Sequence, residues 1–146
     1  MLVKNWMNRN IITVDANESM LDAINLLKKH DMLMLPVMRN GELVGVVTDR
    51  DLKRASASDA TTLEVHELMY ILSKIKVKEI MSRPPVTVPV DYTLEETAEI
   101  LLNNKISGVP VVDHNGQVAG TISQNELFRA MLSVTGLQKR GVQFAF

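Results

Sequence analysis

The hydrophobic and polar positions of the 146-residue chain follow the same order twice. Each half opens with a short apolar run and continues with apolar residues three and four positions apart, the spacing of a helix with one buried face. Two runs of strand-forming residues and a second helical segment follow. The apolar helical positions are Met20, Ala23, Ile24 and Leu27 in the first half, and Leu94, Thr97, Ala98 and Leu101 in the second. Each half is therefore predicted to form a β-α-β-β-α unit.

The two halves also match residue by residue, which indicates an internal repeat. At an offset of 74, Met7 aligns with Met81 and the pair Pro36-Val37 aligns with Pro110-Val111. One inserted residue in the second hairpin loop changes the offset to 75, so that Gly45 then matches Gly120, Thr48 matches Ser123 and Ala55 matches Ala130. A register interrupted by a single turn insertion is the mark of a duplicated unit.

Local signals set the expected element boundaries. The first strands are predicted at Ile11 to Val14 and Val86 to Val88, and the pairs Ser19/Asp22 and Thr93/Glu96 have the spacing of a helix capping box. Asn-Gly at 40–41 and 115–116 suits a tight hairpin turn, because both residues tolerate a positive φ. The last helix of each copy is expected to start after Thr48 or Ser123.

The segment between the copies has a different composition. Residues 56–64, "SASDATTLE", form a small and polar linker, and apolar positions at Val65, Leu68, Met69, Leu72 and Ile75 predict an extra helix. A single unit would leave one sheet face uncovered, whereas two copies related by a pseudo-twofold axis cover each other. The predicted fold class is therefore α/β (α+β), with repeat 1 at 1–60, linker and helix at 61–76, repeat 2 at 77–134 and a tail at 135–146.

Composition and charge narrow the classes of function. A formal net charge of -1 gives no drive toward nucleic acid or an anionic membrane, and neither is expected as a partner. The chain has no cysteine, no run of 18 apolar residues and no secretory leader, which fits a cytoplasmic protein. Its histidines, His30, His66 and His114, lack the spacing of metal ligands, so no metal site is predicted.

One turn, Thr48-Asp49-Arg50-Asp51, places a hydroxyl, two carboxylates and a guanidinium in four consecutive residues. It allows three interpretations. Thr48 can simply cap the following helix. Asp49 and Asp51 could instead form a catalytic pair, although residues two apart do not share a helix face. In the third interpretation Asp51 accepts hydrogen bonds from the hydroxyls of a ribose while Arg50 and Lys53 reach phosphates. The apolar segment Lys105 to Val112 would then supply a wall, with Ser107 and Gly108 allowing close approach to a base.

Several motifs resemble one known family. The tandem units, "GELVGVVTDRDL", "SGVPVVD" and "VKEIMSRPPVTV" are similar to a cystathionine-β-synthase (CBS) domain pair, or Bateman module, over residues 1 to about 134. The resemblance implies a regulatory module that is not an enzyme, with no catalytic residue and no catalytic cofactor. It also implies binding of an adenosine compound (AMP, ADP, ATP or a related adenosyl ligand) in clefts between the repeats.

The resemblance assigns residues to two clefts. Site one would comprise Thr48, Arg50, Asp51, Pro85, Val86, Ile106, Ser107, Gly108, Val109 and Pro110. In it Asp51 would hold the ribose hydroxyls, and Thr48 and Arg50 the phosphates. Site two would comprise Ile11, Ile12, Met32, Met34, Leu35, Pro36, Ser123 and Glu126. Site two departs from the family pattern, because Glu126 is one methylene longer than aspartate and "MLML" replaces "ISGV"; it is expected to be empty, weak or different in specificity.

The sequence also gives expectations for how the chain assembles and for its C-terminal tail. The family resemblance implies a homodimer through helices, with Leu52, Leu127, Phe128, Met131 and Leu132 available for contact. The tail "TGLQKRGVQFAF" ends in a strand-like run, Val142 to Phe146, similar to the start of the C-terminal ACT-like domain of acetoin-utilisation-type CBS proteins. A partner protein or such a domain would receive the signal.

Two alternative functions stay open: a structural dimerisation module with vestigial clefts, and a hydrolase using Asp49, Asp51 and Glu126.

Overall fold

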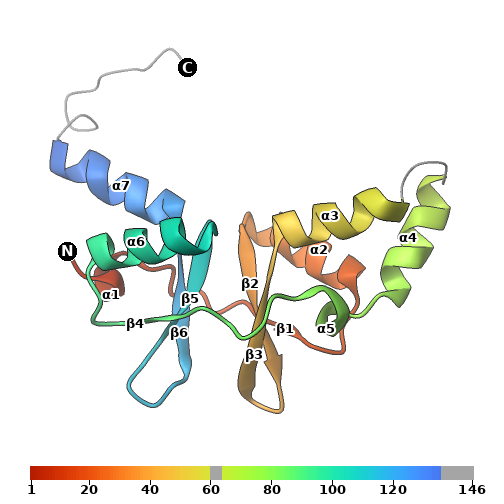
Figure 1. Cartoon of the computed structure of the whole chain (residues 1–146), viewed down its shortest axis with the longest axis horizontal. Helices are drawn as coiled ribbons and strands as arrows, with labels where there is room; N and C mark the ends of the chain where they lie inside the picture. The colour runs from red at the N-terminus through yellow and green to blue at the C-terminus, as the bar shows by residue number, and fades with distance from the viewer. Residues whose placement is uncertain (60–63, 136–146) are drawn as a thin grey trace.

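The computed structural model describes residues 1–59 and 64–135, and these form two similar halves side by side. The hairpins of both halves point the same way, and the long helices lie at the opposite end of the sheets (Figure 1). The first half contains β1 (Val14–Asp15), α2 (Met20–His30), β2 (Met34–Arg39), β3 (Glu42–Thr48) and α3 (Asp49–Asp59). The second contains β4 (Val88–Pro89), α6 (Leu94–Asn104), β5 (Gly108–Val112), β6 (Val118–Ser123) and α7 (Gln124–Thr135). Three more helices are α1 (Val3–Trp6), α4 (Val65–Lys74) and α5 (Val77–Ile80).

The two three-stranded sheets have the same topology, with strand orders β1-β2-β3 and β4-β5-β6. In each, the first strand runs parallel to the second and the second pairs antiparallel with the third. The predicted hairpin turns are confirmed: Asn40 and Gly41 have φ of 52° and 79°, and Gly116 has φ of 76°. The predicted fold class, two β-α-β-β-α repeats, is therefore confirmed.

The predicted capping boxes are also confirmed. In the first copy the Asp22 amide donates to Ser19 Oγ at 3.1 Å, and the Ser19 amide donates back to Asp22 Oδ2 at 3.3 Å. Thr93 and Glu96 repeat this exchange at 3.0 and 3.2 Å. Both helices thus satisfy two of the amides that a helix start leaves without a partner.

Two boundaries differ from the prediction. The first strands are shorter and later than expected, since only Val14 and Asp15 pair with β2 and only Val88 and Pro89 pair with β5. The residues before them cross between the halves instead of extending the ladder. The helix expected from Val65 through Ile75 ends at Lys74, and Ile75 is its extended C-cap.

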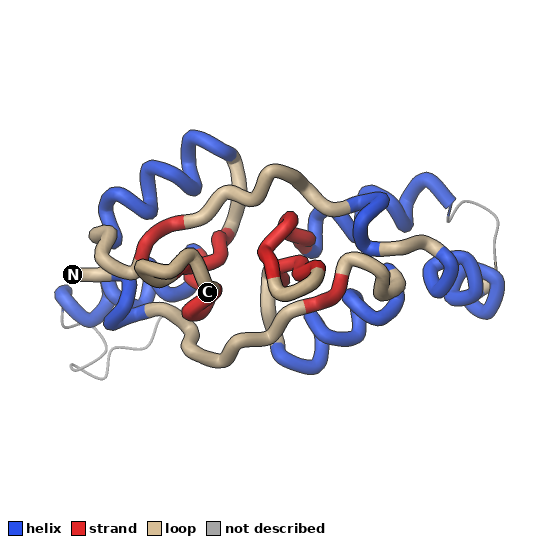
Figure 2. The backbone as a smooth tube through the Cα atoms, turned by 90° about the horizontal axis from the view of Figure 1, so that it is seen from below, coloured by secondary structure: helices blue, strands red, loops and turns tan. Residues whose placement is uncertain are grey.

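The crossing segments exchange short helices between the repeats. Helix α1 precedes repeat 1 but packs on repeat 2, where the Val3 amide donates to the Tyr92 carbonyl at 2.8 Å. Helix α5 precedes repeat 2 but packs on repeat 1, where the Val77 amide donates to the Glu18 carbonyl at 2.8 Å. Figure 2 shows the two connecting loops passing from one half to the other on opposite sides of the sheets. The repeats are therefore held together by two swapped segments.

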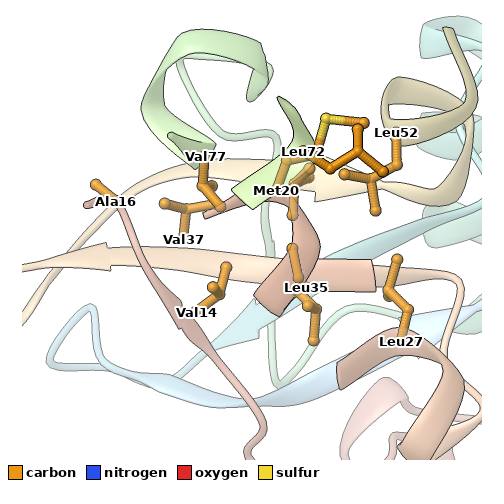
Figure 3. Packing of buried hydrophobic residues seen from close by; sticks show 11 residues of the cluster. Val14, Ala16, Met20, Leu27, Leu35, Val37, Leu52, Leu72 and Val77 are labelled. Atoms are coloured by element: carbon orange, nitrogen blue, oxygen red, sulfur yellow. The ribbon is translucent and has the colours of Figure 1, made fainter. Parts of the chain in front are cut away.

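Each repeat has its own apolar core, and each core includes a residue of a swapped helix. Figure 3 shows the first core, in which Leu72 of α4 lies beside Met20 and Val77 of α5 beside Val37. The second core contains Val3 of α1. The two cores meet where β2 approaches β5, because a Cβ added to Gly108 would lie 3.1 Å from Cγ of Met34. Met34 and Gly108 are equivalent positions of the repeat, so this contact marks the pseudo-twofold axis.

The polar linker is only partly within the described structure, since residues 60–63 lie outside it. The predicted tail strand, Val142 to Phe146, lies outside the described residues as well. None of the helices in 1–59 and 64–135 has the length and apolar character needed to cross a membrane.

Candidate functional site

The strand-to-helix turn of repeat 1 is a capping box. The Asp51 amide donates to Thr48 Oγ1 at 3.1 Å, and the Thr48 amide donates to Asp51 Oδ2 at 3.0 Å. The interpretation in which Thr48 caps the following helix is therefore confirmed. It does not exclude a ligand, because Asp51 Oδ1 forms no hydrogen bond within the described residues and can still accept one.

A groove runs past this turn and between the two repeats. It has a volume of about 1690 Å³, above the roughly 300–1,000 Å³ of most small-molecule pockets. We call it the inter-repeat groove. At one end it is lined by the turn at Thr48 to Asp51, by Leu33, and across the axis by Ile106, Ser107 and Gln124. At the other end it continues between α6 and α7.

Two helix starts converge on the polar end of the groove. The Asp49 amide at the start of α3 donates to the Leu33 carbonyl at 3.2 Å, and the Gln124 amide at the start of α7 donates to the Ser107 carbonyl at 2.8 Å. These equivalent hydrogen bonds fix each helix start against the residue before the second strand of its own repeat. The positive ends of both helix dipoles therefore face the same space, which favours an anionic ligand group there.

Basic side chains on the walls of the groove reinforce this preference for an anionic group. Arg50, Lys53 and Arg54 are three and four positions apart on α3 and all line the groove, with Lys105 on the opposite wall. Lys53 lies 3.7 Å from Asp49 in an exposed ion pair, which holds both side chains only weakly. Asp49 and Asp51 thus have separate local partners, an arrangement that does not resemble a catalytic carboxylate pair.

The structure brings together half of the residues predicted for site one. Thr48, Arg50, Asp51, Ile106 and Ser107 line the inter-repeat groove. The other five do not line it: Pro85 and Val86 are half-buried, and Gly108, Val109 and Pro110 are buried in β5. The two repeats therefore meet at site one chiefly through the turn after β3 and the residues just before β5.

The equivalent turn of repeat 2 has a different hydrogen-bond pattern. Both the amide and the hydroxyl of Ser123 donate to Glu126 Oε2, the amide at 2.8 Å. The other carboxylate oxygen, Oε1, lies 3.8 Å from Arg129 Nη1. Glu126 Oε2 thus accepts two hydrogen bonds from Ser123, while its Oε1 has only an arginine at ion-pair distance that holds it weakly. The extra methylene of Glu126 makes this difference, because it lets the carboxylate reach the Ser123 hydroxyl and the side chain one turn later.

The residues predicted for site two do not form an open site around the strand-to-helix turn of repeat 2. None of the eight residues predicted for site two lines the inter-repeat groove. Met34, Leu35 and Pro36 are buried in β2, Ile12 and Met32 pack against the first core, and Ile11 is exposed. Where repeat 2 has the small residues Ser107 and Gly108, repeat 1 has Leu33 and Met34, and the large side chain of Met34 lies against Gly108.

The sequence alone did not identify several residues of the groove. Arg54 and Gln124 line it but lie in no segment that the sequence singled out, whereas Leu33 and Lys105 lie in the segments "MLML" and Lys105 to Val112 without having been assigned to a site. The repeat offers a signal for two of them, because Leu33 is equivalent to Ser107 and Gln124 to Asp49, and the groove lies on the pseudo-twofold axis. No group of three or more His, Cys, Asp or Glu side chains that could hold a metal occurs within 1–59 and 64–135.

Comparison with known proteins agrees with this architecture. The CBS domain family model matches residues 3–58 and 77–133. The CBS domain pair of protein MJ0100, solved with 5′-methylthioadenosine and S-adenosyl-L-methionine, is 30 % identical, with a TM-score of 0.77 over 91 % of this chain and 97 % of that one. The structure of CBSX2, a CBS-pair protein of Arabidopsis thaliana, in complex with AMP is 29 % identical, with a TM-score of 0.73 over 92 % and 98 %. A CBS domain-containing protein of Dictyostelium discoideum is 29 % identical over 91 % of this chain and 92 % of its own length.

The swapped repeats, the paired sheets and the groove that both repeats line define a module of two tandem repeats with a shared cleft. The chain belongs to the CBS domain family and is a CBS pair. It is a regulatory ligand-binding module rather than an enzyme.

Proposed function

We propose that this CBS pair senses an adenosyl ligand, with AMP, ADP or ATP as the leading class, and that the ligand occupies site one. The adenosine would lie between the turn at Thr48 to Asp51 and the two residues before β5, Ile106 and Ser107. The ribose hydroxyls would donate to Asp51, and the phosphates would face Arg50 and the start of α3. Occupancy would then shift the position of one repeat against the other.

The observation that carries this proposal is the available oxygen of Asp51 within a groove shared by both repeats. Asp51 Oδ2 accepts from the Thr48 amide, so the carboxylate is already oriented, and its second oxygen has no partner in the described structure. An oriented acceptor binds a ribose hydroxyl with little loss of side-chain entropy. Similar CBS pairs are described in complex with AMP and with adenosyl sulfur compounds, which supports the same ligand class here.

The same reasoning makes site two the weaker site. Glu126 already accepts hydrogen bonds from Ser123 and pairs with Arg129. A ribose would have to compete with the Ser123 amide and hydroxyl for Oε2, and the weak ion pair with Arg129 lies beside Oε1. We therefore propose one ligand per chain, in site one.

The regulatory output is proposed to pass to a second copy of the chain, to a partner protein or to a C-terminal domain. The likeness of the tail to acetoin-utilisation-type proteins remains a prediction, as does a cytoplasmic location. A purely structural dimerisation module with vestigial clefts is the main alternative. It predicts assembly with no response to any adenosyl compound.

The test is to identify what the purified protein carries and binds. Mass spectrometry of the ligand released on denaturation, followed by calorimetric titration with AMP, ATP and S-adenosylmethionine, would establish the class. The proposal predicts one saturable site for at least one adenosyl compound. A protein that releases none and binds none of the three would be a structural module instead.

A further inference from the structure

Basic side chains gather on the walls of site one but not at the equivalent positions of site two. The four that line the inter-repeat groove are Arg50, Lys53, Arg54 and Lys105. The equivalent positions in the other repeat hold Asn125, Phe128, Arg129 and Asp31. Among these only Arg129 is basic, and it lies 3.8 Å from Glu126. The positive charge is therefore concentrated on one of the two sites.

Three of the four basic side chains have no anionic partner in the protein. Lys53 lies 3.7 Å from Asp49. Arg50, Arg54 and Lys105, by contrast, form no ion pair and no side-chain hydrogen bond within the part of the chain that the structure describes. A groove lined by uncompensated charges of one sign attracts ligands of the opposite sign. The walls of site one are thus suited to more negative charge than the protein itself supplies.

Arg54 and Lys105 lie at opposite walls of the groove and come from different repeats. Arg50 directly precedes Asp51 in the first turn of α3, next to the proposed position of the ribose. Arg54 is three residues after Asp51, about 4.5 Å further along the helix axis. Lys105 directly precedes Ile106 in repeat 2. Arg50 therefore suits the first phosphate of a nucleotide, and the other two cations are available for phosphates beyond it.

Lys105 also has a backbone conformation that lysine rarely adopts. It is the C-cap of α6, with φ of 55° and ψ of 45°, in the left-handed region that glycine and asparagine favour at helix ends. The equivalent residue of repeat 1, Asp31, has nearly the same conformation, and aspartate tolerates it better than lysine does. A lysine at this position adds a cation to the groove at the expense of a less favourable backbone.

We infer that site one prefers a nucleoside di- or triphosphate to AMP and to S-adenosylmethionine, and that Arg54 and Lys105 determine this preference. The inference rests on the proposed function, because it takes the ribose to be held by Asp51. Each phosphate beyond the first adds negative charge that these two cations can pair with, whereas a sulfonium would bring a positive charge next to Arg50. Phosphates held by Arg54 and Lys105 together would also link the two repeats, which AMP cannot do.

Calorimetric titration of the full chain with AMP, ADP, ATP and S-adenosylmethionine, in the presence of EDTA, tests the preference. The parent should bind ATP about tenfold or more tightly than AMP, with S-adenosylmethionine the weakest. Arg54→Gln and Lys105→Asn each remove one cation, and asparagine suits the positive φ of residue 105. Each variant should lower the affinity for ATP about fivefold more than the affinity for AMP. Lys29→Gln is the matched control, because Lys29 is exposed on α2 and does not line the groove; it should leave the ratio of the two affinities unchanged.

Three results would overturn the inference and leave the proposed function standing. They are equal affinities for AMP and ATP, tighter binding of S-adenosylmethionine than of ATP, or a ratio that Arg54→Gln and Lys105→Asn change no more than Lys29→Gln does. Binding of none of the four compounds would overturn the proposed function and the inference with it.

Ionic strength provides a test that needs no variant. Raising it from about 0.1 to 1 M shortens the screening length from about 10 to 3 Å. The ratio of ATP to AMP affinity in the parent should then fall, because the preference comes from charge. An unchanged ratio would overturn the assignment to Arg54 and Lys105, even if one of the variants failed to fold.

Discussion

The amide of Val3 donates to the carbonyl of Tyr92 at 2.8 Å, although 89 positions separate these residues in the sequence. The contact inserts Val3, which is fully buried, into the core of the second repeat. Val77, the equivalent of Val3 in the second copy, makes the same contact with Glu18, the equivalent of Tyr92 in the first copy, also at 2.8 Å. The stability of each repeat therefore depends on a segment that precedes the other one.

This exchange predicts that Val3 is a core residue despite its place near the terminus. Val3→Ala should lower the free energy of unfolding by about 1–3 kcal/mol, and Val77→Ala by a similar amount, because each leaves a cavity in an equivalent core. Lys4→Ala is the control, since its exposed ion pair with Asp91 contributes little. Chemical denaturation measures all three. A neutral Val3→Ala would mean that the N-terminal segment does not pack on repeat 2.

The crossing segments also explain two glycines in the third strands. A Cβ on Gly120 would overlap the carbonyl oxygen of Asn8, and that oxygen already accepts from the Thr121 amide. At Gly45 the nearest atoms are Met81 Sδ at 2.7 Å and the Ser82 carbonyl oxygen at 2.9 Å. Each glycine lets the chain from the other repeat lie against the strand.

We expect Gly120→Ala to destabilise the protein by about 1–3 kcal/mol, the usual cost of overpacking, and Gly45→Ala to cost less. The ranking follows because the closest atom at Gly45 belongs to a methionine side chain that can move and the Ser82 carbonyl oxygen there is less close, whereas at Gly120 the Cβ directly overlaps the hydrogen-bonded Asn8 carbonyl. Thermal unfolding of the two variants tests it. Equal midpoints for both variants and the parent would contradict the crossing geometry.

The tail makes a separate prediction from the sequence. If residues 136–146 begin a further module, their removal should leave the unfolding midpoint and the nucleotide affinity of the CBS pair unchanged. The deletion variant tests this directly by calorimetry. Loss of binding or unfolding on deletion would assign the tail to the CBS pair itself.

Much of the fold was predictable because its determinants are local and occur twice. Asn40-Gly41 indicates the turn, Ser19 and Asp22 indicate the helix start, and the second copy confirms the register. The swapped helices were not predictable in the same way. Val3 and Val77 each lie in a helix of four residues, and nothing in so short a pattern states which of two similar cores receives it.

The candidate site was predictable in its motif but not in its detail. Thr48 and Asp51 stood out by residue type and position. The sequence showed that the copies differ by one methylene at Glu126 and by "MLML" in place of "ISGV", whereas the structure shows the consequence at Glu126, whose Oε2 accepts from both the amide and the hydroxyl of Ser123. Asp51 and Arg54 have the same spacing as Glu126 and Arg129, but no ion pair joins them. Side-chain length therefore decides which carboxylate remains available, and sequence spacing alone does not show this.

The unfolding midpoint of three proteins with and without AMP tests the central claim most directly: the parent, Asp51→Asn and Glu126→Gln. The amide oxygen of Asp51→Asn can still accept from the Thr48 amide and keep the helix cap, but its NH₂ group cannot accept from a ribose hydroxyl. At about 100 times Kd, AMP should stabilise the parent by about 2.7 kcal/mol, or roughly 5–10 °C. Glu126→Gln should keep this shift and Asp51→Asn should lose most of it. A shift that persists in Asp51→Asn, or that disappears only in Glu126→Gln, would contradict ligand binding at site one.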